Sequence, residues 1–422
     1  MARMVTSMPL DLPPHPPTTG EEFFRTEGTY TGLGAPIPGG KIDRWILSEG
    51  PHIDSHVEFF DELCWRLVGD GVPLWRATLY AGTLHPLIRG IGARWLRELK
   101  LVEDFRILHG SGQTNEYLRS PIRATIERGT PFRLRLDAEI PEYPLLEKLR
   151  KAGATDYFAL ALNLTFRQFP VVTWATDRPH GFSDADIAAL EDINTALAAI
   201  VETRVVRRVS ANLLDTYFGP QAGRRILAGQ IRQGEGERLR AVVMMTDLRE
   251  FTSLSDQLPG DEVIELLDDY FDALATPIQE RKGEVLKFMG DGMLAIFPAA
   301  DDDDFSTSSV RALEAATEGL ERLEAVNEAR RAVGRSELRT GIGLHLGEVI
   351  YGNVGAADRL DFTVIGPAVN LASRLEDLTK RLSRPMLFSS AFARICPRPL
   401  VSLGFQPVRG LNDPEEVFGL PE

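Results

Sequence analysis

The sequence predicts an α+β protein with two folded domains, and three observations support this. The 422 residues are too many for one ordinary core, so two domains are the default expectation. The first half contains short β-rich runs interrupted by helical patterns, which indicates antiparallel strands with flanking helices. The second half contains a buried strand, a long helix and a two-stranded hairpin in succession.

The composition excludes several classes of protein. Hydrophobic residues make up 43% and charged residues 26%, as in ordinary globular proteins. The formal net charge of -14 argues against broad attraction to nucleic acid or anionic lipid. The two cysteines, Cys64 and Cys396, exclude a disulfide scaffold and suit the reducing cytoplasm. No apolar stretch approaches the roughly 20 residues that span a bilayer, so we expect a cytoplasmic protein without a membrane span.

The first domain is expected over residues 45–200, after a leader over 1–44. The leader opens with the proline-rich run "MARMVTSMPLDLPPHPPTTG", which predicts disorder. A helical pattern over 52–71 is followed by five β-rich runs, from "LWRATLYAG" to "FPVVTWATD", and by an inserted helix over 143–153. The closing helix has Ser183 as its candidate N-cap, ahead of acidic residues. We expect the helices to lie on one face of the antiparallel strands.

The order of these elements resembles that of a GAF domain. The resemblance rests on the topology and on the phrase "GFSDADIAALEDI", which opens the closing helix. GAF domains bind small ligands or mediate dimerisation, so the resemblance implies a sensor domain for an unknown small ligand. A domain that binds nothing and only dimerises remains an open alternative. His85, His109 and His180 lack metal-ligand spacing, so we interpret them as surface or packing residues.

A helical linker is expected over residues 201–237. Apolar residues from Ile193 to Val209 form a narrow stripe that suits a parallel helix pair. The run "NLLDTYFGPQAGRRILAGQIRQGEGERL" follows, and it lacks the Lys-Ser/Thr of a phosphate-binding P-loop. We interpret this run as a connector of short helices and turns between the domains.

Two aspartates stand at strand ends in the second half. A buried strand, "RAVVMM", leads to Asp247, and "EVLKFMGDGMLAIFP" predicts a β-hairpin with Asp291 at its tip. The glycines beside Asp291 permit a tight turn and the close approach of a ligand. Two carboxylates on rigid strand ends are a typical magnesium site, because magnesium completes its coordination shell with phosphate oxygens. For Asp291 alone, ordinary turn chemistry is the alternative.

Four motifs in the second half together resemble a class III nucleotide cyclase catalytic domain, over residues 238–422. They are "MMTDLREFTSLSD", "GEVLKFMGDGMLAIF", "LRTGIGLHLGEVIYGNVG" and "DFTVIGPAVNLASRLE", in the order and spacing of that family. The connector, with "YFGPQAGRRILAGQIRQG", also resembles the helical transducer that precedes many bacterial members.

The cyclase resemblance implies a two-metal mechanism. Asp247 and Asp291 match the aspartates that hold two Mg²⁺ or Mn²⁺ ions, which assist attack of the ribose 3′-hydroxyl on the α-phosphate. Asn370 and Arg374 match the pair that stabilises the transition state, and their spacing of four puts them on one face of a helix. Cyclisation depends mainly on positioning and electrostatics, which these residues can supply.

The resemblance also implies ATP as the substrate. Lys287 and Thr363 match the positions that recognise the purine: the lysine can donate to N1 of adenine, and the threonine hydroxyl can accept from the 6-amino group. Guanylate cyclases of the family typically carry Glu at the lysine position. Arg359 and Arg409 match positions that contact the triphosphate. The sequence therefore predicts an adenylate cyclase.

The family builds each active site across a dimer interface, so the resemblance implies a homodimer with two equivalent sites. The N-terminal domain would then regulate the catalytic pair through the linker. One alternative is a catalytically weak or inactive cyclase-like module that binds nucleotide or dimerises. A diguanylate cyclase is disfavoured, because "FMGDGMLAI" lacks the GGDEF-type turn.

Overall fold

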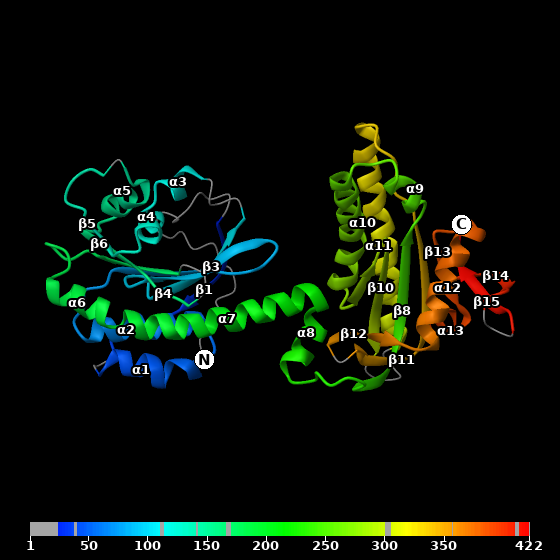
Figure 1. Cartoon of the computed structure of the whole chain (residues 1–422), viewed down its shortest axis with the longest axis horizontal. Coiled ribbons are helices and arrows are strands. Elements are labelled where there is room, and N and C mark those ends of the chain that lie inside the picture. Colours follow the sequence, from blue (N-terminus) through cyan, green and yellow to red (C-terminus); the bar gives the residue numbers. More distant parts are fainter. Residues whose placement is uncertain are drawn as a thin grey trace. The chain divides into compact units, whose positions relative to one another are not determined.

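The computed structural model of the chain describes residues 24–37, 40–109, 114–140, 142–165, 170–299, 305–356, 358–409 and 413–421. The chain divides into two compact units, Met1–Thr216 and Tyr217–Glu422 (Figure 1). Each unit contains one large β-sheet with helices packed on it. Among the described helices, none combines the length and the apolar character of a bilayer-spanning segment.

The N-terminal unit is built on a seven-stranded sheet with the order β1-β4-β3-β2-β7-β6-β5, in which every neighbouring pair is antiparallel. Its strands are β1 (Phe24–Thr31), β2 (Arg76–Gly82), β3 (Ile88–Leu96), β4 (Leu101–Leu108), β5 (Phe132–Arg135), β6 (Asp156–Ala161) and β7 (Val171–Thr176). Its helices are α1 (Ile42–Ser48), the short 3₁₀ helix η2 (Gly50–His52), α2 (His56–Gly69), α3 (Asn115–Leu118), α4 (Pro121–Arg128), α5 (Pro144–Lys151), α6 (Asp184–Asp192) and α7 (Asn194–Phe218).

Helices cover both faces of this sheet, which corrects the prediction of helices on one face. One core cluster joins the sheet to α1, α2, α6 and α7, and a second joins its other face to α4 and α5 (Figure 1). In the five central strands, successive side chains point to opposite faces of the sheet, and most of them are buried. These strands therefore supply apolar side chains to both clusters.

The predicted disordered leader over residues 1–44 is wrong for its second part. Strand β1 pairs with β4, and α1 begins at Ile42. Strand β1 supplies hydrogen-bond partners to the backbone groups of β4. Without β1, those groups would be unpaired and β4 would be the exposed edge of the sheet. The proline-rich run over 1–20 lies outside the described residues.

The predicted cap at Ser183 is confirmed. Its hydroxyl accepts from the Asp186 backbone N–H at 3.2 Å, and Asp186 returns the bond in a capping box. The helix that follows is divided at Ile193 into α6 and α7, rather than continuous.

The apolar stripe from Ile193 to Val209 belongs to the core of this unit. Ile193, Leu197 and Val205 are buried in the cluster that α7 shares with α2 and the sheet, and Val209 packs against it. The prediction that the stripe serves a parallel helix pair is therefore wrong, because its apolar side chains are already covered within the unit. Beyond the stripe, α7 exposes Leu213 and Tyr217.

The C-terminal unit is built on an eight-stranded sheet with the order β14-β15-β13-β11-β8-β10-β9, and β12 pairs with the far part of β11. Its strands are β8 (Gly236–Leu248), β9 (Glu284–Met289), β10 (Gly292–Ala299), β11 (Thr340–Ala356), β12 (Arg359–Ile365), β13 (Met386–Ser389), β14 (Val401–Gln406) and β15 (Glu415–Gly419). Its helices are α8 (Pro220–Leu227), α9 (Phe251–Ser255), α10 (Gly260–Glu280), α11 (Phe305–Ala332), α12 (Pro367–Arg381) and α13 (Ser390–Ala393).

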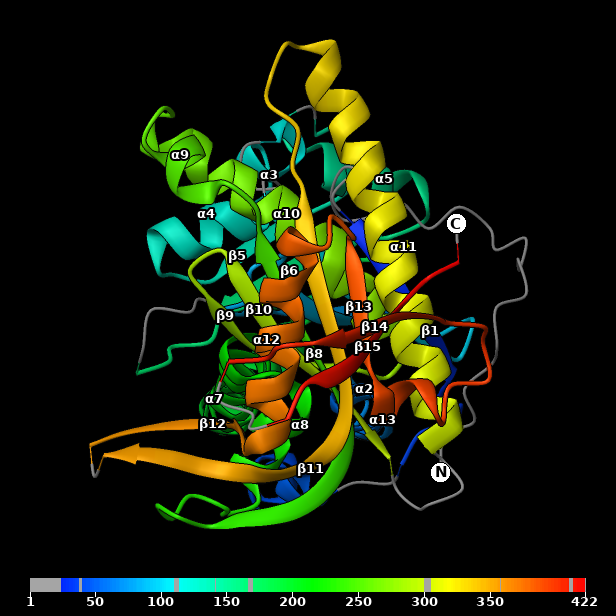
Figure 2. The same cartoon turned by 90° about the vertical axis from the view of Figure 1, so that its right-hand side faces the viewer.

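Helix α12 lies directly on β11, on the face of the sheet opposite α10 and α11 (Figure 2). The glycines of "GIGLHLG" permit this close approach. A Cβ atom on Gly343 would lie 2.6 Å from the backbone nitrogen of Glu376, and one on Gly347 would lie 2.7 Å from Cβ of Ala368. Any larger residue would therefore push α12 away from the sheet and displace the residues that it carries.

Candidate active site

Asp247 and Asp291 lie next to each other at one end of the sheet. Asp247 is near the end of the central strand β8, where it pairs with Gly292 of β10 and Gly341 of β11. Asp291 occupies the two-residue loop between β9 and β10, and its backbone carbonyl accepts from the Leu248 N–H at 3.2 Å. The predicted hairpin tip is thus confirmed, and it is held against the end of β8.

The two glycines that flank Asp291 have separate functions. Gly290 has a φ of +66°, a left-handed conformation that side chains with a Cβ rarely adopt. Gly292 lies against β8: a Cβ atom there would be 3.0 Å from the Thr246 carbonyl oxygen and 3.2 Å from Oδ1 of Asp247. The first glycine therefore makes the turn, and the second makes room for the Asp247 carboxylate.

The site is strongly acidic. Partial burial, together with the charges of Asp291 and Asp377, raises the pKa of Asp247 to about 6. Burial, together with the charges of Asp247 and Asp377, raises the pKa of Glu376 on α12 to about 8. A divalent cation at this end of the sheet would relieve the repulsion among these carboxylates.

The donor set fits magnesium or manganese bound with a nucleotide. Among the described residues, no group of three or more His, Cys, Asp or Glu side chains is arranged to hold a metal ion. If Asp247 and Asp291 held such an ion, water and phosphate oxygens would fill its other coordination positions. Magnesium is commonly bound in this way, through one or two carboxylates plus substrate phosphates.

Lys287 and Thr363 lie on different strands, and Lys287 pairs with another residue of the strand that carries Thr363. The exposed Lys287 on β9 forms an ion pair with Asp361 on β12. Thr363 is two residues further along β12, on the same face as Asp361, and is half-buried. Sequence reasoning missed Asp361, although the two-residue strand period relative to Thr363 could have indicated it.

Asn370 and Arg374 lie one turn apart on α12, as predicted from their spacing. Helix α12 follows β12 through Gly366, which has a φ of +141°, and begins at Pro367. Asn370 is exposed and Arg374 is half-buried. Nη1 of Arg374 is buried without a hydrogen-bond partner among the described residues, so it is a cationic donor that an anion could satisfy.

Arg359 and Arg409 are both exposed. Arg359 begins β12, and Arg409 follows β14 in a turn. Neither contributes to the pKa shift of Asp247, whereas Asp377 of α12 does. Among the described residues, neither arginine forms an ion pair with Asp247 or Asp291.

Comparison with known proteins identifies the region that carries these residues. Residues 237–383, from β8 to just beyond α12, match the family model "Adenylate and Guanylate cyclase catalytic domain". This region is a cyclase catalytic domain. The predicted cyclase resemblance is confirmed for it, whereas the resemblance of the N-terminal unit to a GAF domain stays a prediction.

Two curated adenylate cyclases are similar to this chain. Adenylate cyclase 1 of Rhizobium meliloti (strain 1021) is 30% identical over 258 residues, which cover 60% of this chain and 38% of the relative. The adenylate cyclase of Anabaena cylindrica is 34% identical over 230 residues, which cover 50% of this chain and 44% of the relative. The chain thus spans less than half the length of these relatives.

Solved structures of both kinds of cyclase are also similar to this chain. The adenylyl cyclase CyaB from P. aeruginosa is 27% identical, with 44% of this chain and 94% of that chain covered, at a TM-score of 0.40. The guanylyl cyclase Cya2 is 30% identical, with 43% and 92% covered, at a TM-score of 0.39.

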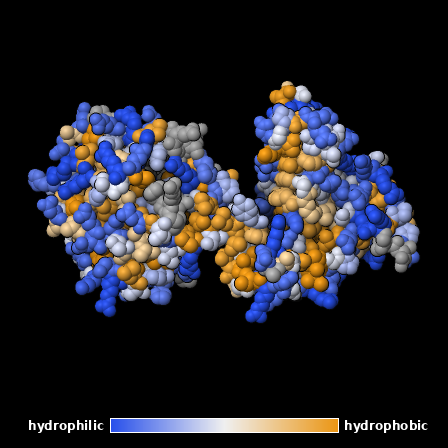
Figure 3. Space-filling view, in the orientation of Figure 1, coloured by the Kyte–Doolittle hydropathy of each residue, from blue (hydrophilic) through white to orange (hydrophobic). Residues whose placement is uncertain are grey.

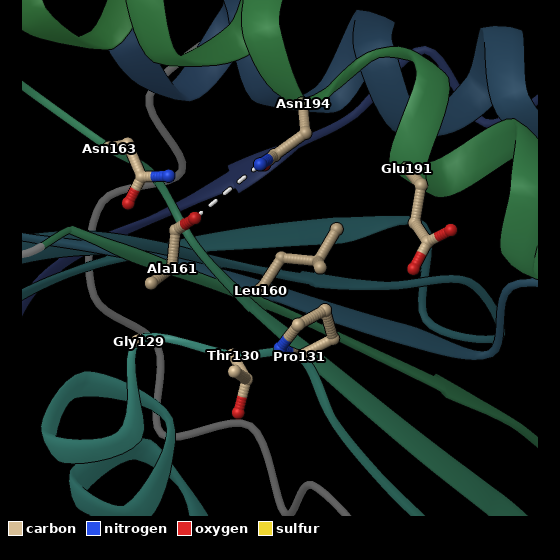
Figure 4. Close-up of a pocket in the computed structure, with 8 residues that line it drawn as sticks. All are labelled: Gly129, Thr130, Pro131, Leu160, Ala161, Asn163, Glu191 and Asn194. Atoms are coloured by element: carbon tan, nitrogen blue, oxygen red, sulfur yellow. Dashed lines mark hydrogen bonds between the residues drawn. The ribbon is translucent and has the colours of Figure 1, made fainter.

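The N-terminal unit contains a cavity of about 260 Å³ beside the start of α7 (Figure 4). Two of its lining residues are joined by a hydrogen bond, from Nδ2 of Asn194 to the Ala161 carbonyl at 3.4 Å. Oδ1 of Asn194 is buried without a hydrogen-bond partner among the described residues. The residues that line the cavity are Gly129, Thr130, Pro131, Leu160, Ala161, Asn163, Glu191 and Asn194. The predicted small ligand of this unit stays a prediction.

Proposed function

We propose that the protein is an adenylate cyclase that converts ATP into 3′,5′-cyclic AMP and pyrophosphate. The observation that carries the proposal is the pair of neighbouring carboxylates, Asp247 and Asp291, at the end of the central strand of a cyclase catalytic domain. The similarity to two curated adenylate cyclases supports adenine as the base.

Asp247 and Asp291 would hold two Mg²⁺ or Mn²⁺ ions, which when bound acidify the ribose 3′-hydroxyl and neutralise phosphate charge. Arg374 would donate from its unpartnered Nη1 to an α-phosphate oxygen, where negative charge increases in the transition state. Asn370, one turn earlier on α12, would orient the nucleotide. Arg359 and Arg409 would contact the triphosphate.

Base selection rests on Lys287 and Thr363 in this proposal. Lys287 would donate to N1 of adenine, and the Thr363 hydroxyl would accept from the 6-amino group. The ion pair with Asp361 supports this role, because it draws the lysine side chain toward the strand that carries Thr363. Guanine presents a donor at N1 and would meet the lysine donor unfavourably.

A homodimer with shared active sites is part of the proposal. The C-terminal unit exposes large apolar side chains on β9, β11 and β12, namely Phe288, Met289, Ile350, Val354 and Ile365. Apolar side chains also gather on the surface over α8 (Figure 3), where Leu227 is exposed. Exposed apolar groups on neighbouring elements are typical of a surface that a second subunit covers. In such a dimer, the carboxylates of one subunit would face Asn370 and Arg374 of the other.

The N-terminal unit would regulate the catalytic unit as a GAF-like sensor, with α7 and α8 as the connection. The expected domain limits are 45–200 for the sensor, 201–237 for the linker and 238–422 for the catalytic domain. Both cysteines are buried and unpaired, which supports a cytoplasmic location.

The experiment that tests the proposal is incubation of the purified full chain with ATP or GTP and Mg²⁺ or Mn²⁺, with chromatographic separation of the products. Cyclic AMP and pyrophosphate from ATP, formed faster than cyclic GMP from GTP, are the expected result. Preference for GTP would contradict the base assignment. Nucleotide binding without any cyclic product would instead favour a catalytically inactive regulatory or dimerisation module.

A further inference from the structure

The N-terminal unit buries a positive charge that no described side chain neutralises by contact. Arg76, the first residue of β2, is only 3% exposed. Its Nη1 and Nη2 atoms are both buried without a hydrogen-bond partner among the described residues. Because a guanidinium stays protonated in proteins, these are charged donors removed from water, and burial of this kind is strongly unfavourable unless a partner is present.

Polar groups from three strands surround the Arg76 guanidinium. In the strand register Arg76 pairs with Ala175 and Thr78 pairs with Thr173, and Ala175 pairs in turn with Tyr157 of β6. These side chains line one small cavity, which Leu145 and Leu149 of α5 close from above the sheet. The Tyr157 hydroxyl is also buried in this group and lies beside the Thr173 side chain.

A second buried arginine, Arg94, lies close enough to Arg76 to lower its pKa. Arg94, the cross-strand neighbour of Thr78, is buried as well, but its Nη1 forms an ion pair with Glu103 at 2.6 Å. Glu103 thus pairs with Arg94, and among the described residues no carboxylate forms a hydrogen bond with Nη1 or Nη2 of Arg76. Burial, and then the charge of Arg94, lowers the pKa of Arg76 to about 9, so Arg76 is still a cation at neutral pH.

The size of the cavity limits what can neutralise Arg76. Its volume is about 10 Å³, the space of roughly one water-sized sphere. A nucleotide or an aromatic ligand therefore does not fit while α5 stays in place. A monatomic anion comes nearest to this volume, whereas a carboxylate as small as formate requires Leu145 and Leu149 to move.

We propose that Arg76, Thr78, Tyr157 and Thr173 form a binding site for one small monovalent anion between the sheet and α5. The guanidinium supplies the charge and two donors, and the hydroxyl groups supply further donors. The anion neutralises the buried cation and thereby stabilises the N-terminal unit. This site is separate from the cavity beside α7 and does not depend on the proposed cyclase activity.

The tryptophans make the N-terminal unit observable by itself. All five of them belong to this unit, at positions 45, 65, 75, 95 and 174. Thermal unfolding of the full chain followed by tryptophan fluorescence therefore reports the stability of this unit. The probes are sodium chloride and sodium formate, each titrated against sodium gluconate at constant ionic strength, because gluconate is too large for the cavity.

We expect the fluorescence midpoint to rise by roughly 3–6 °C when the anion reaches about ten times its dissociation constant. A rise with chloride alone assigns a halide site, and a rise with formate assigns a site for carboxylates. Equal midpoints in chloride, formate and gluconate would overturn the proposal, because water would then satisfy the guanidinium equally well.

Arg76→Met tests the site directly, because it removes the charge and keeps an extended side chain. The variant's fluorescence midpoint should no longer depend on chloride or formate.

Arg123→Met is the matched control. Arg123 lies in the same unit, is paired with Glu127 and is partly exposed, so the dependence on the anion should persist in this variant. If Arg76→Met does not fold, Tyr157→Phe removes only a hydroxyl and should raise the half-saturating anion concentration about fivefold to tenfold. An unchanged anion response in Arg76→Met, or in Tyr157→Phe if Arg76→Met does not fold, would overturn the assignment.

Discussion

Replacing Asp291 with asparagine tests the carboxylate pair on which the proposed function depends. The substitution should preserve the hairpin, because the backbone carbonyl of Asp291, not its side chain, accepts from Leu248. It removes one of the two charges that would hold the metal ions. We expect turnover of ATP to fall at least about a hundredfold, equivalent to about 3 kcal/mol of transition-state stabilisation.

The same substitution should also change how metal binding depends on pH. Asp247 has a pKa of about 6, and as a metal ligand it would have to be ionised. About nine-tenths of it is ionised at pH 7 and about one-tenth at pH 5, so metal affinity should fall roughly tenfold between these values. Without the charge of Asp291 the pKa of Asp247 decreases, and the loss of affinity moves to lower pH. Burial, the larger cause, keeps that pKa above its ordinary value.

The assay is calorimetric titration of the full chain with Mn²⁺ between pH 5 and 8 in the absence of nucleotide, combined with turnover measurements. Asp377→Asn is the matched control, since Asp377 also raises the pKa of Asp247 but is not a proposed ligand. It should lower the pH midpoint and retain turnover at saturating metal. Near wild-type turnover of Asp291→Asn at saturating metal, or wild-type affinity that is constant from pH 5 to 7, would refute the reasoning.

Three further predictions follow from the site. Inactive Asp291→Ala mixed with inactive Arg374→Ala should regain activity, because a heterodimer assembles one intact site; no recovery in mixtures shown by mass to contain heterodimers contradicts the shared site. Lys287→Glu combined with Thr363→Cys should lower the ATP to GTP efficiency ratio roughly tenfold or more, because the introduced carboxylate would face the N1 acceptor of adenine without a donor; steady-state kinetics with an unchanged ratio would exclude these residues as the base readers. The pKa of Glu376 is raised from 4.5 to about 8, so between these values the folded metal-free protein holds a proton that the unfolded chain releases, and stability declines as the pH rises from about 5 to 8; Glu376→Gln should flatten that decline, and circular dichroism melts with the wild-type slope would argue against this.

The sequence by itself determined those features that depend on neighbouring residues. The capping box of Ser183, the hairpin turn at Asp291 and the placement of Asn370 and Arg374 on one helix face were all predictable. Each depends on hydrogen bonds or spacing within a few residues, so the local sequence contains the whole signal. The cyclase motifs were likewise visible as short runs in a fixed order.

Only the tertiary structure decided which distant segments meet and what they bury. The pairing of β1 with β4, the ion pair of Lys287 with Asp361 across 74 positions, and the burial of Arg76 under α5 have no local signature. Nor did the apolar stripe of α7 reveal whether its own unit or a second subunit would cover it. The reason is physical, because strand pairing and burial depend on the surface of the partner segment. The local sequence of an arginine or an apolar stripe is identical whichever surface covers it.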